Sequence, residues 1–191
     1  QADAMPRLGL GLAKFRDGKV EEGRREMEVA ASLDPNNSMI RSYLGKAYFE
    51  EKRSDMTERE YANAKELDPK DPTPFFYDAL QKQLTNRPIE ALQDMEKAIA
   101  LNDNRAVYRG QLQLDSDVAA RSSALGRIYQ NLGFQYQALV EGWSSVNTDP
   151  TSYAAHRFLA DSYSIIPNQK IARVSELLVS QLLQPVNITP I

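Results

Sequence analysis

The 191-residue chain contains no cysteine, a single histidine and a single tryptophan. Without cysteine, disulfide bonds, thiolate nucleophiles and cysteine-ligated zinc sites are excluded. A metal site built on His156 would have only carboxylates to complete it, so we expect no metal site and a structural or surface role for this residue. We expect the side chain of Trp143 to be wedged between helix pairs.

Other patterns that carry a function are also missing. The nine glycines occur singly, so no Gly-rich phosphate-binding loop is present, and nothing resembles a nucleophile elbow. No run of about 18 apolar residues could span a bilayer. The net charge of −3 lacks the basic excess of a nucleic-acid-binding protein. We therefore predict that the chain is not an enzyme, uses no cofactor, binds no nucleic acid and does not insert into a membrane.

What the sequence does contain is an internal repeat. Hydrophobic residues make up 42% of the chain, which is enough apolar content for a packed core. The dipeptides Asp34-Pro35 and Asp68-Pro69 lie 34 residues apart, and Asp103 stands 34 residues after Pro69. A Leu-Gly pair recurs in step at residues 10–11, 44–45 and 125–126, each followed within a turn by an aromatic residue. A period of this length is the signature of a repeat protein.

Each of these residue types has a physical role in a stack of helix pairs. Glycine or alanine lets two helix backbones approach closely where they cross. Leucine and aromatic side chains fill the space between neighbouring pairs. Proline cannot continue a helix, so Asp-Pro marks the end of each second helix. A single pair cannot bury its apolar face alone, and stacking of pairs supplies the core.

The pattern resembles the tetratricopeptide repeat (TPR), a unit of about 34 residues with Leu-Gly, Tyr, Gly, Ala, a large apolar residue, Ala and a closing Pro. The second unit supplies Leu44, Gly45, Tyr48, Tyr61, Ala64 and Pro69. The resemblance implies an all-α fold, a solenoid of about five antiparallel helix pairs in a right-handed superhelix. We place the units at about 4–37, 38–71, 72–103, 117–152 and 153–186, in a single TPR domain over 1–191 that is a fragment of a longer protein.

The second helix of each pair is predicted to begin near Val20, Thr57, Pro88, Phe134 and Asn168. The interval between the third and fourth units is longer than the others by about 13 residues, and the excess falls around 104–116. This insertion is either a surface loop or an extended segment along the solenoid. Ser116 or Asp117 is the expected N-cap of a long helix that runs to about Leu132.

Charge is concentrated in the first part of the chain. The first 103 positions hold 20 of the 26 acidic and 16 of the 23 basic residues. The sparse charge of the rest indicates either a face covered by another molecule or compositional drift. The last helix is apolar around much of its circumference, whereas the exposed end of a solenoid is normally polar. We expect that the parent chain continues beyond it or that it packs on another subunit.

In the TPR family the first helix of each unit lines a concave groove. Carrying those positions over gives the candidate partner-binding residues Leu8, Leu12, Phe15, Lys46, Phe49, Phe76, Leu80, Arg127, Gln130, Arg157 and Asp161. Chaperone-binding members clamp a terminal carboxylate with Lys and Asn, but Leu8 and Leu12 stand at those early positions, so that clamp is not expected. The groove is predicted to be apolar at its N-terminal end and basic at the other, which suits a segment with apolar anchors and an acidic group.

A second resemblance covers the stretch from Arg109 to Ile191. Leu-Gly-Arg-Ile-Tyr-Gln-Asn-Leu-Gly, ending at Gly133, and Ala-His-Arg-Phe-Leu-Ala, ending at Ala160, are similar to TPR segments of large Gram-negative envelope proteins. This implies a scaffold on the periplasmic side, near the outer membrane and an export machine, with a cytoplasmic location as the alternative. We predict that the chain binds a protein or peptide partner. The alternatives are a homo-oligomer formed through the C-terminal helix and a regulatory domain of a larger enzyme.

Overall fold

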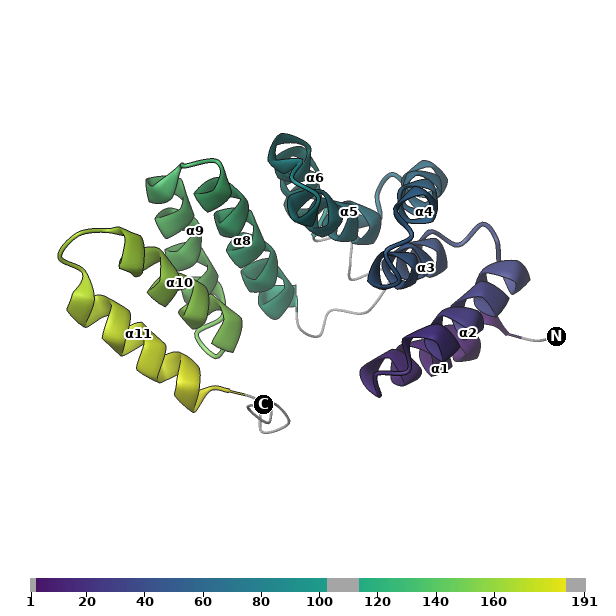
Figure 1. Ribbon diagram of the computed structural model, residues 1–191, viewed down its shortest axis with the longest axis horizontal. Helices are drawn as coiled ribbons and strands as arrows, with labels where there is room; N and C mark the ends of the chain where they lie inside the picture. The colour runs from purple at the N-terminus through teal and green to yellow at the C-terminus, as the bar shows by residue number, and fades with distance from the viewer. Residues whose placement is uncertain (1–2, 103–113, 185–191) are drawn as a thin grey trace. The chain divides into compact units, whose positions relative to one another are not determined.

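The computed structural model describes residues 3–102 and 114–184, with side chains from residue 118 onward in the second range. Within these ranges the regular structure is entirely α-helical (Figure 1). The helices are α1 (Ala4–Arg16), α2 (Val20–Leu33), α3 (Ser38–Glu50), α4 (Ser54–Leu67), α5 (Pro72–Leu84), α6 (Pro88–Ala100), α8 (Leu114–Asn131), α9 (Gln135–Thr148), α10 (Tyr153–Ile165) and α11 (Lys170–Leu182).

The ten described helices follow one another as five pairs, which confirms the predicted all-α repeat architecture. The first helix of each pair is α1, α3, α5, α8 or α10, and the second follows after a short turn. The chain divides into two compact units, Gln1–Gln81 and Lys82–Ile191, with the boundary inside the last turn of α5. The first unit holds α1 to α4 and most of α5, and the second holds α6 to α11.

The turn inside each pair contains one residue in the left-handed region of φ. These residues are Gly18 (78°), Lys52 (59°), Asn86 (61°), Gly133 (85°) and Asn168 (67°). Glycine has no Cβ to clash and asparagine tolerates this region, whereas lysine adopts it at a cost. The second helices have no side-chain hydrogen bond at the N-cap, so the backbone of this turn directs their start.

The first helices begin differently, with polar side chains that cap them. Asp3, Asn37 and Ser152 each accept a hydrogen bond from a backbone N–H in the first turn, at 3.0 to 3.3 Å. Asp71, directly before α5, accepts from a backbone N–H of α5 at 2.8 Å and from the hydroxyl of Ser38 at 3.0 Å. The latter bond joins the start of α5 to the start of α3 in the first unit.

The glycines of the three Leu-Gly pairs lie where helices cross. A Cβ on Gly11 would lie 2.9 Å from the carbonyl oxygen of Gly23, so α1 and α2 meet backbone to backbone. A Cβ on Gly45 would lie 2.7 Å from the ring of Tyr61 on α4. One on Gly126 would overlap with the ring of Phe158 on α10. The sequence pattern predicted glycine or alanine at such crossings, and at these three positions a Cβ would lie under 3.0 Å from its neighbours, so glycine is required.

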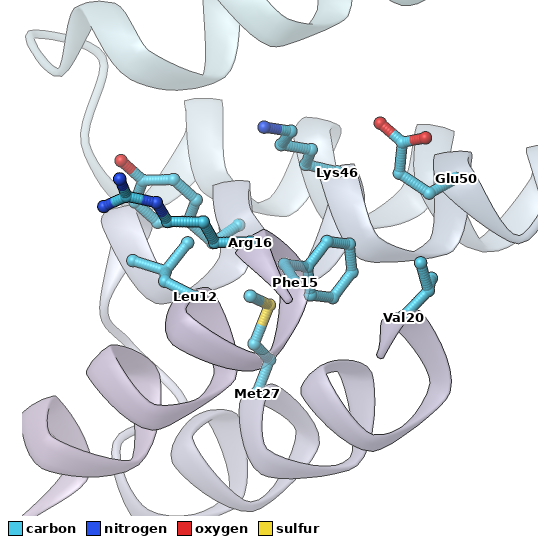
Figure 2. Close-up of a pocket in the computed structure, with 8 residues that line it drawn as sticks. Leu12, Phe15, Arg16, Val20, Met27, Lys46 and Glu50 are labelled. Atoms are coloured by element: carbon cyan, nitrogen blue, oxygen red, sulfur yellow. The ribbon is translucent and has the colours of Figure 1, made fainter. Parts of the chain in front are cut away.

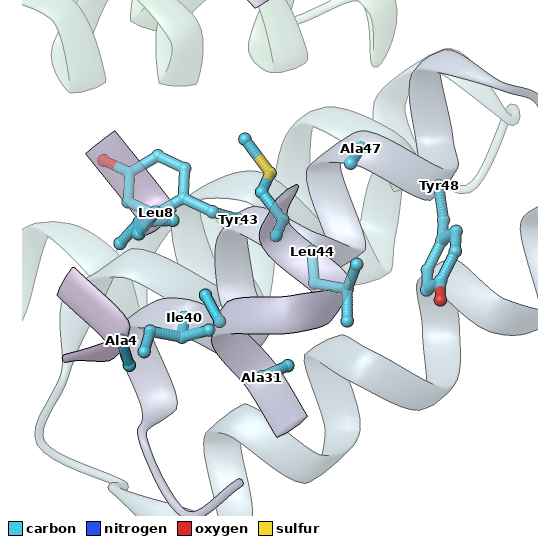
Figure 3. Close-up of a cluster of buried hydrophobic side chains, with 10 residues drawn as sticks. Ala4, Leu8, Ala31, Ile40, Tyr43, Leu44, Ala47 and Tyr48 are labelled. Atoms are coloured by element: carbon cyan, nitrogen blue, oxygen red, sulfur yellow. The ribbon is translucent and has the colours of Figure 1, made fainter. Parts of the chain in front are cut away.

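The core of the first unit lies between its first two pairs, where apolar residues of α1 and α2 pack against those of α3. Figure 3 shows this cluster, which contains Ala4, Leu8, Met27, Ala30, Ala31, Ile40, Tyr43, Leu44, Ala47 and Tyr48. Two polar contacts lie beside this cluster. Arg24 Nε lies 2.7 Å from Glu51 Oε1, and the hydroxyl of Tyr48 donates to Glu28 at 2.9 Å. Burial and this hydrogen bond raise the pKa of Tyr48 to about 12.

The second unit uses buried polar groups as well as apolar packing. The guanidinium of Arg121 on α8 is buried and donates to the carbonyl oxygen of Ala98, near the C-terminal end of α6, at 2.5 Å. A cation is favourable at this negative end of a helix. Between α8 and α9, the hydroxyls of Ser123 and Ser145 lie 2.9 Å apart, and both donate to the carbonyl oxygen of Ala119 at 2.6 Å.

His156 has the expected structural role. It is buried on α10, its Nδ1 lies 2.5 Å from Glu176 Oε2 on α11, and its Nε2 lies 2.9 Å from the carbonyl oxygen of Pro150. The expectation for Trp143 is wrong, because this side chain is 44% exposed on α9 instead of wedged between pairs. Its indole N–H donates to the hydroxyl of Tyr163 at 2.7 Å.

The helix boundaries depart from the predicted ones by a few residues. Helices α2 and α6 begin at the predicted residues, whereas α4 begins three residues before Thr57. The long helix α8 is confirmed, but it begins at Leu114, ahead of the predicted N-cap Ser116. The predicted insertion at 104–116 lies, up to residue 113, outside the described residues.

Half-burial of the Glu141 carboxyl on α9 raises its pKa above the ordinary value of 4.5, although a hydrogen bond from Ser122 acts in the opposite direction. The unfolded chain therefore loses this proton at a lower pH than the folded chain does. As a result, Glu141 lowers stability as pH rises above about 4.5, and it has no such effect at lower pH.

The Gly45→Ala substitution tests the crossing of α3 and α4. We expect an unfolding free energy lower by about 1–2 kcal/mol, because overpacking against Tyr61 outweighs the higher helix propensity of alanine. The control is Gly9→Ala on α1, where a Cβ would meet no atom within 4 Å. That substitution should stabilise by about 0.5–1 kcal/mol. Urea titrations followed by circular dichroism measure both, and equal effects of the two substitutions would contradict the role of the crossing.

The Glu141→Gln substitution tests the buried carboxyl. We expect a higher urea midpoint than in the original chain at pH 7, because glutamine keeps an acceptor for Ser122 without the cost of burying charge. The difference between the two proteins should shrink as the pH is lowered towards 4.5. A difference independent of pH would show that charge burial is not its cause.

Candidate partner-binding site

A hollow of about 390 Å³ opens in the first unit beside the first helices α1 and α3 (Figure 2). Its volume is within the range of small ligand pockets, roughly 300–1,000 Å³. Three helices contribute the residues that line it, which are Leu12, Phe15 and Arg16 on α1, Val20 and Met27 on or at the start of α2, and Tyr43, Lys46 and Glu50 on α3.

The apolar part of the hollow is held in place by the crossing of α1 and α2. Met27 is buried, and Leu12 and Phe15 lie next to it with partly exposed side chains (Figure 2). A Cβ on Gly23 would overlap with the ring of Phe15, so the glycine leaves the space in which this ring rests on α2. The wall is therefore formed by the packing of the pair itself.

The remaining lining residues bring charge to the hollow. Arg16 and Lys46 are cationic and Glu50 is anionic. Within residues 3–102 and 114–184, none of the three forms an ion pair. Lys46 Nζ instead lies 5.3 Å from the ring centroid of Tyr77 on α5, at cation–π distance. The charges are thus available to a bound molecule.

Aromatic side chains extend this surface along the first unit. The ring centroids of Tyr43 and Tyr77 lie 5.7 Å apart, and those of Tyr77 and Phe76 lie 5.4 Å apart. Both pairs are tilted by 57°, within the usual geometry of interacting aromatic rings. The face formed by α1, α3 and α5 is therefore apolar and aromatic, with Lys46 in its middle.

The corresponding face of the second unit is polar. Gln130 on α8 donates to the hydroxyl of Ser162 on α10 at 3.0 Å. Arg157 Nε lies 3.6 Å from Asp161 Oδ1 one turn later on α10, in an exposed pair that contributes little to stability. Arg127 on α8 is exposed. This face offers hydrogen-bonding and charged groups in place of an apolar hollow.

Solved structures with the same arrangement of helices identify the fold. Pseudomonas aeruginosa pilF is 16% identical and superposes with a TM-score of 0.78 over 96% of this chain and 78% of that chain. PilW, a type IV pilus biogenesis factor, is 16% identical with a TM-score of 0.77 over 98% and 79%. YrrB, a TPR protein with an unusual peptide-binding site, is 17% identical with a TM-score of 0.60 over 97% and 88%. The chain has the TPR fold. No protein-family model and no curated protein matches it.

The TPR fold places the predicted partner-binding residues of the first unit in different surroundings. Leu12, Phe15 and Lys46 line the hollow. Leu8 is only 2% exposed and belongs to the core, because the face of α1 that carries it is covered by α2 and α3. Three further predicted partner-binding residues lie outside the hollow and are half-buried, namely Phe49, Phe76 and Leu80.

The groove positions carried over from the TPR family do not include several of the residues that line the hollow. Tyr43 precedes Lys46 by three positions and Glu50 follows it by four, so all three share one face of α3. Extending the face of Lys46 along the helix would have found both. Arg16 follows Phe15 directly at the end of α1, and only the position of the turn to α2 brings it to the hollow.

These two faces carry apolar, aromatic, hydrogen-bonding and charged side chains. Among the described residues, no three His, Cys, Asp or Glu side chains come together as metal ligands. Over the same residues, no helix is both long and apolar enough to cross a bilayer. The first unit presents a hollow with buried Met27 at its base, and the charged residues Arg16, Lys46 and Glu50 belong to the same lining.

Proposed function

We propose that the chain is a protein–protein interaction scaffold and that the hollow between α1 and α3 receives an apolar side chain of a partner segment. The observation that carries this proposal is the hollow, in which Leu12 and Phe15 are accessible above buried Met27. Fully burying one Leu, Met or Phe side chain stabilises a complex by about 1.5–3 kcal/mol. The TPR fold supports the proposal, since YrrB is described as a TPR protein with a peptide-binding site.

The charges at the hollow favour a partner segment with an acidic group beside its apolar anchor. Arg16 and Lys46 carry positive charge without an ion-pair partner in the described chain, so a carboxylate between them would be stabilised. Glu50 lies one turn beyond Lys46 and would repel a second carboxylate there. This arrangement selects one direction of the bound segment along α3.

The second unit extends the proposed function with polar contacts. Arg127, Gln130, Arg157 and Asp161 stay in the proposed partner-binding set, together with the half-buried residues outside the hollow. Because Arg157 already faces Asp161, Arg127 carries most of the positive charge available on this face. We expect this unit to contribute selectivity, and the first unit to contribute most of the affinity.

The proposed setting is the envelope of a Gram-negative bacterium, on the periplasmic side. The resemblance of residues 109–191 to TPR segments of envelope proteins supports this, as does the fold shared with PilW, described as a type IV pilus biogenesis factor. Fractionation of the source organism, with the parent protein tagged, tests this part. Recovery in the cytoplasmic fraction alone would contradict the setting without affecting the proposal for the hollow.

A structural self-assembly role is the second candidate. The observation that favours it is the exposed apolar side of α11 in the second unit. A regulatory role in a larger enzyme has no comparable observation in its favour among the described residues.

Random-peptide display against the purified chain tests the hollow directly. We expect selected peptides to combine a Leu, Met or Phe with an Asp or Glu close by. The double substitution Arg16→Glu, Lys46→Glu should weaken such a peptide by about thirtyfold, since each lost charge contact is worth roughly 1 kcal/mol. Fluorescence anisotropy measures the affinity, and circular dichroism should show unchanged helicity.

Lys97→Glu provides the matched control for this experiment, because Lys97 is an exposed cation on α6 outside the hollow. It changes the net charge in the same direction, so any loss it causes measures non-specific attraction. Equal weakening by the control and by the single variant Lys46→Glu would contradict the proposed site.

A further inference from the structure

The outer side of α11 carries a row of apolar side chains that no described residue covers. Ile171 is 89% exposed, Val174 64%, Leu178 56% and Leu182 78%. Their spacing of three or four positions puts them on one side of the helix. The opposite side is anchored to α10, where Ser180 is buried and Glu176 contacts His156 (Figure 1).

Comparison with α2 shows what these positions do in another pair. Counted from the first residue of each helix, Val174 takes the place of Arg24 and Leu178 that of Glu28. Arg24 contacts Glu51, and Glu28 accepts a hydrogen bond from Tyr48, so these positions of α2 hold the following pair. In α11 the same positions are apolar and open, which makes them suited to a helix packed alongside.

The ends of α11 indicate the direction of that helix. Its first turn contains Lys170, and Arg173 follows, whereas no acidic residue occurs in the first turn and no basic one in the last. In α2 the first turn holds the acidic Glu21 and Glu22. Cations near the positive N-terminal end of their own helix are unfavourable, and they are favourable beside the negative C-terminal end of another. Within residues 3–102 and 114–184, neither cation forms an ion pair.

We propose that α11 pairs with α11 of a second copy of this chain, antiparallel and about a two-fold axis near its middle. This arrangement covers Val174 of one copy with Leu178 of the other, and Ile171 with Leu182. It also brings Lys170 and Arg173 of each copy beside the C-terminal end of its partner. The two-fold contact is self-complementary, so assembly stops at two copies. The proposal deepens the self-assembly candidate, and it uses no residue of the hollow, so its failure would leave the proposed function of the hollow untouched.

Sedimentation velocity across a concentration series tests the pairing. Because the contact is one helix wide, we expect a weak dimer whose fraction rises between about 10 and 500 μM. The substitution Leu178→Glu should weaken the dimer by at least about tenfold. Val140→Glu is the control, since Val140 is similarly exposed on α9 of the same unit, and it should leave the dimer unchanged.

The double substitution Lys170→Glu, Arg173→Glu separates pairing from the stability of the single chain. Acidic residues at its start stabilise α11 itself, so the urea midpoint of the monomer should rise. The same change places anions beside the partner's negative helix end, and the dimer should weaken by about three- to tenfold. If the urea midpoint of the monomer and the affinity of the dimer both rose, the antiparallel direction would be overturned.

Cross-linking tests the direction independently, because the chain has no cysteine of its own. An equimolar mixture of the Ile171→Cys and Leu182→Cys proteins should form the mixed disulfide in preference to either symmetric one. Preference for the symmetric disulfides indicates a parallel contact and overturns the proposal. A chain that remains monomeric at the highest concentration overturns it as well.

Discussion

The close approach of helix backbones is the constraint on which the rest of the structure depends. At the crossing of α1 and α2, a side chain on Gly11 or on Gly23 would meet the carbonyl oxygen of the other residue. At Gly45 the space that a side chain would need is filled by the ring of Tyr61, and at Gly126 it is filled by the ring of Phe158. A helix pair of this kind cannot bury its apolar side alone, and a neighbouring pair covers that side.

The hollow of the first unit follows from the same constraint. Because Gly23 leaves room for the Phe15 ring, that ring lies against α2 and its other side remains open towards α3. The gap between successive first helices is then bounded by Tyr43 and Lys46. The hollow is thus formed by the packing of helices α1, α2 and α3.

The second helices differ in what their outer sides carry. In the first unit, Arg24 and Glu28 of α2 use polar contacts to hold the next pair. In the second unit, α9 exposes Tyr136, Val140 and Trp143, and α11 exposes its apolar row. The part of the chain with few charges therefore holds two second helices with exposed apolar side chains, although Leu84 and Ile89 in the charged part are exposed as well.

The sequence by itself determined the period, the helix pairs and the crossings, because spacing along a helix fixes which residues share a face. Thus the helix crossings at the Leu-Gly pairs, the helix ends at Asp-Pro and the long helix α8 were all predictable. Tertiary structure decided which of those faces remain open. Leu8 and Phe15 are both apolar on α1, yet packing against α3 buries one and leaves the other accessible. Trp143 is exposed for the same reason. Whether a side chain is buried depends on which helix packs against it, and the local sequence does not specify that contact.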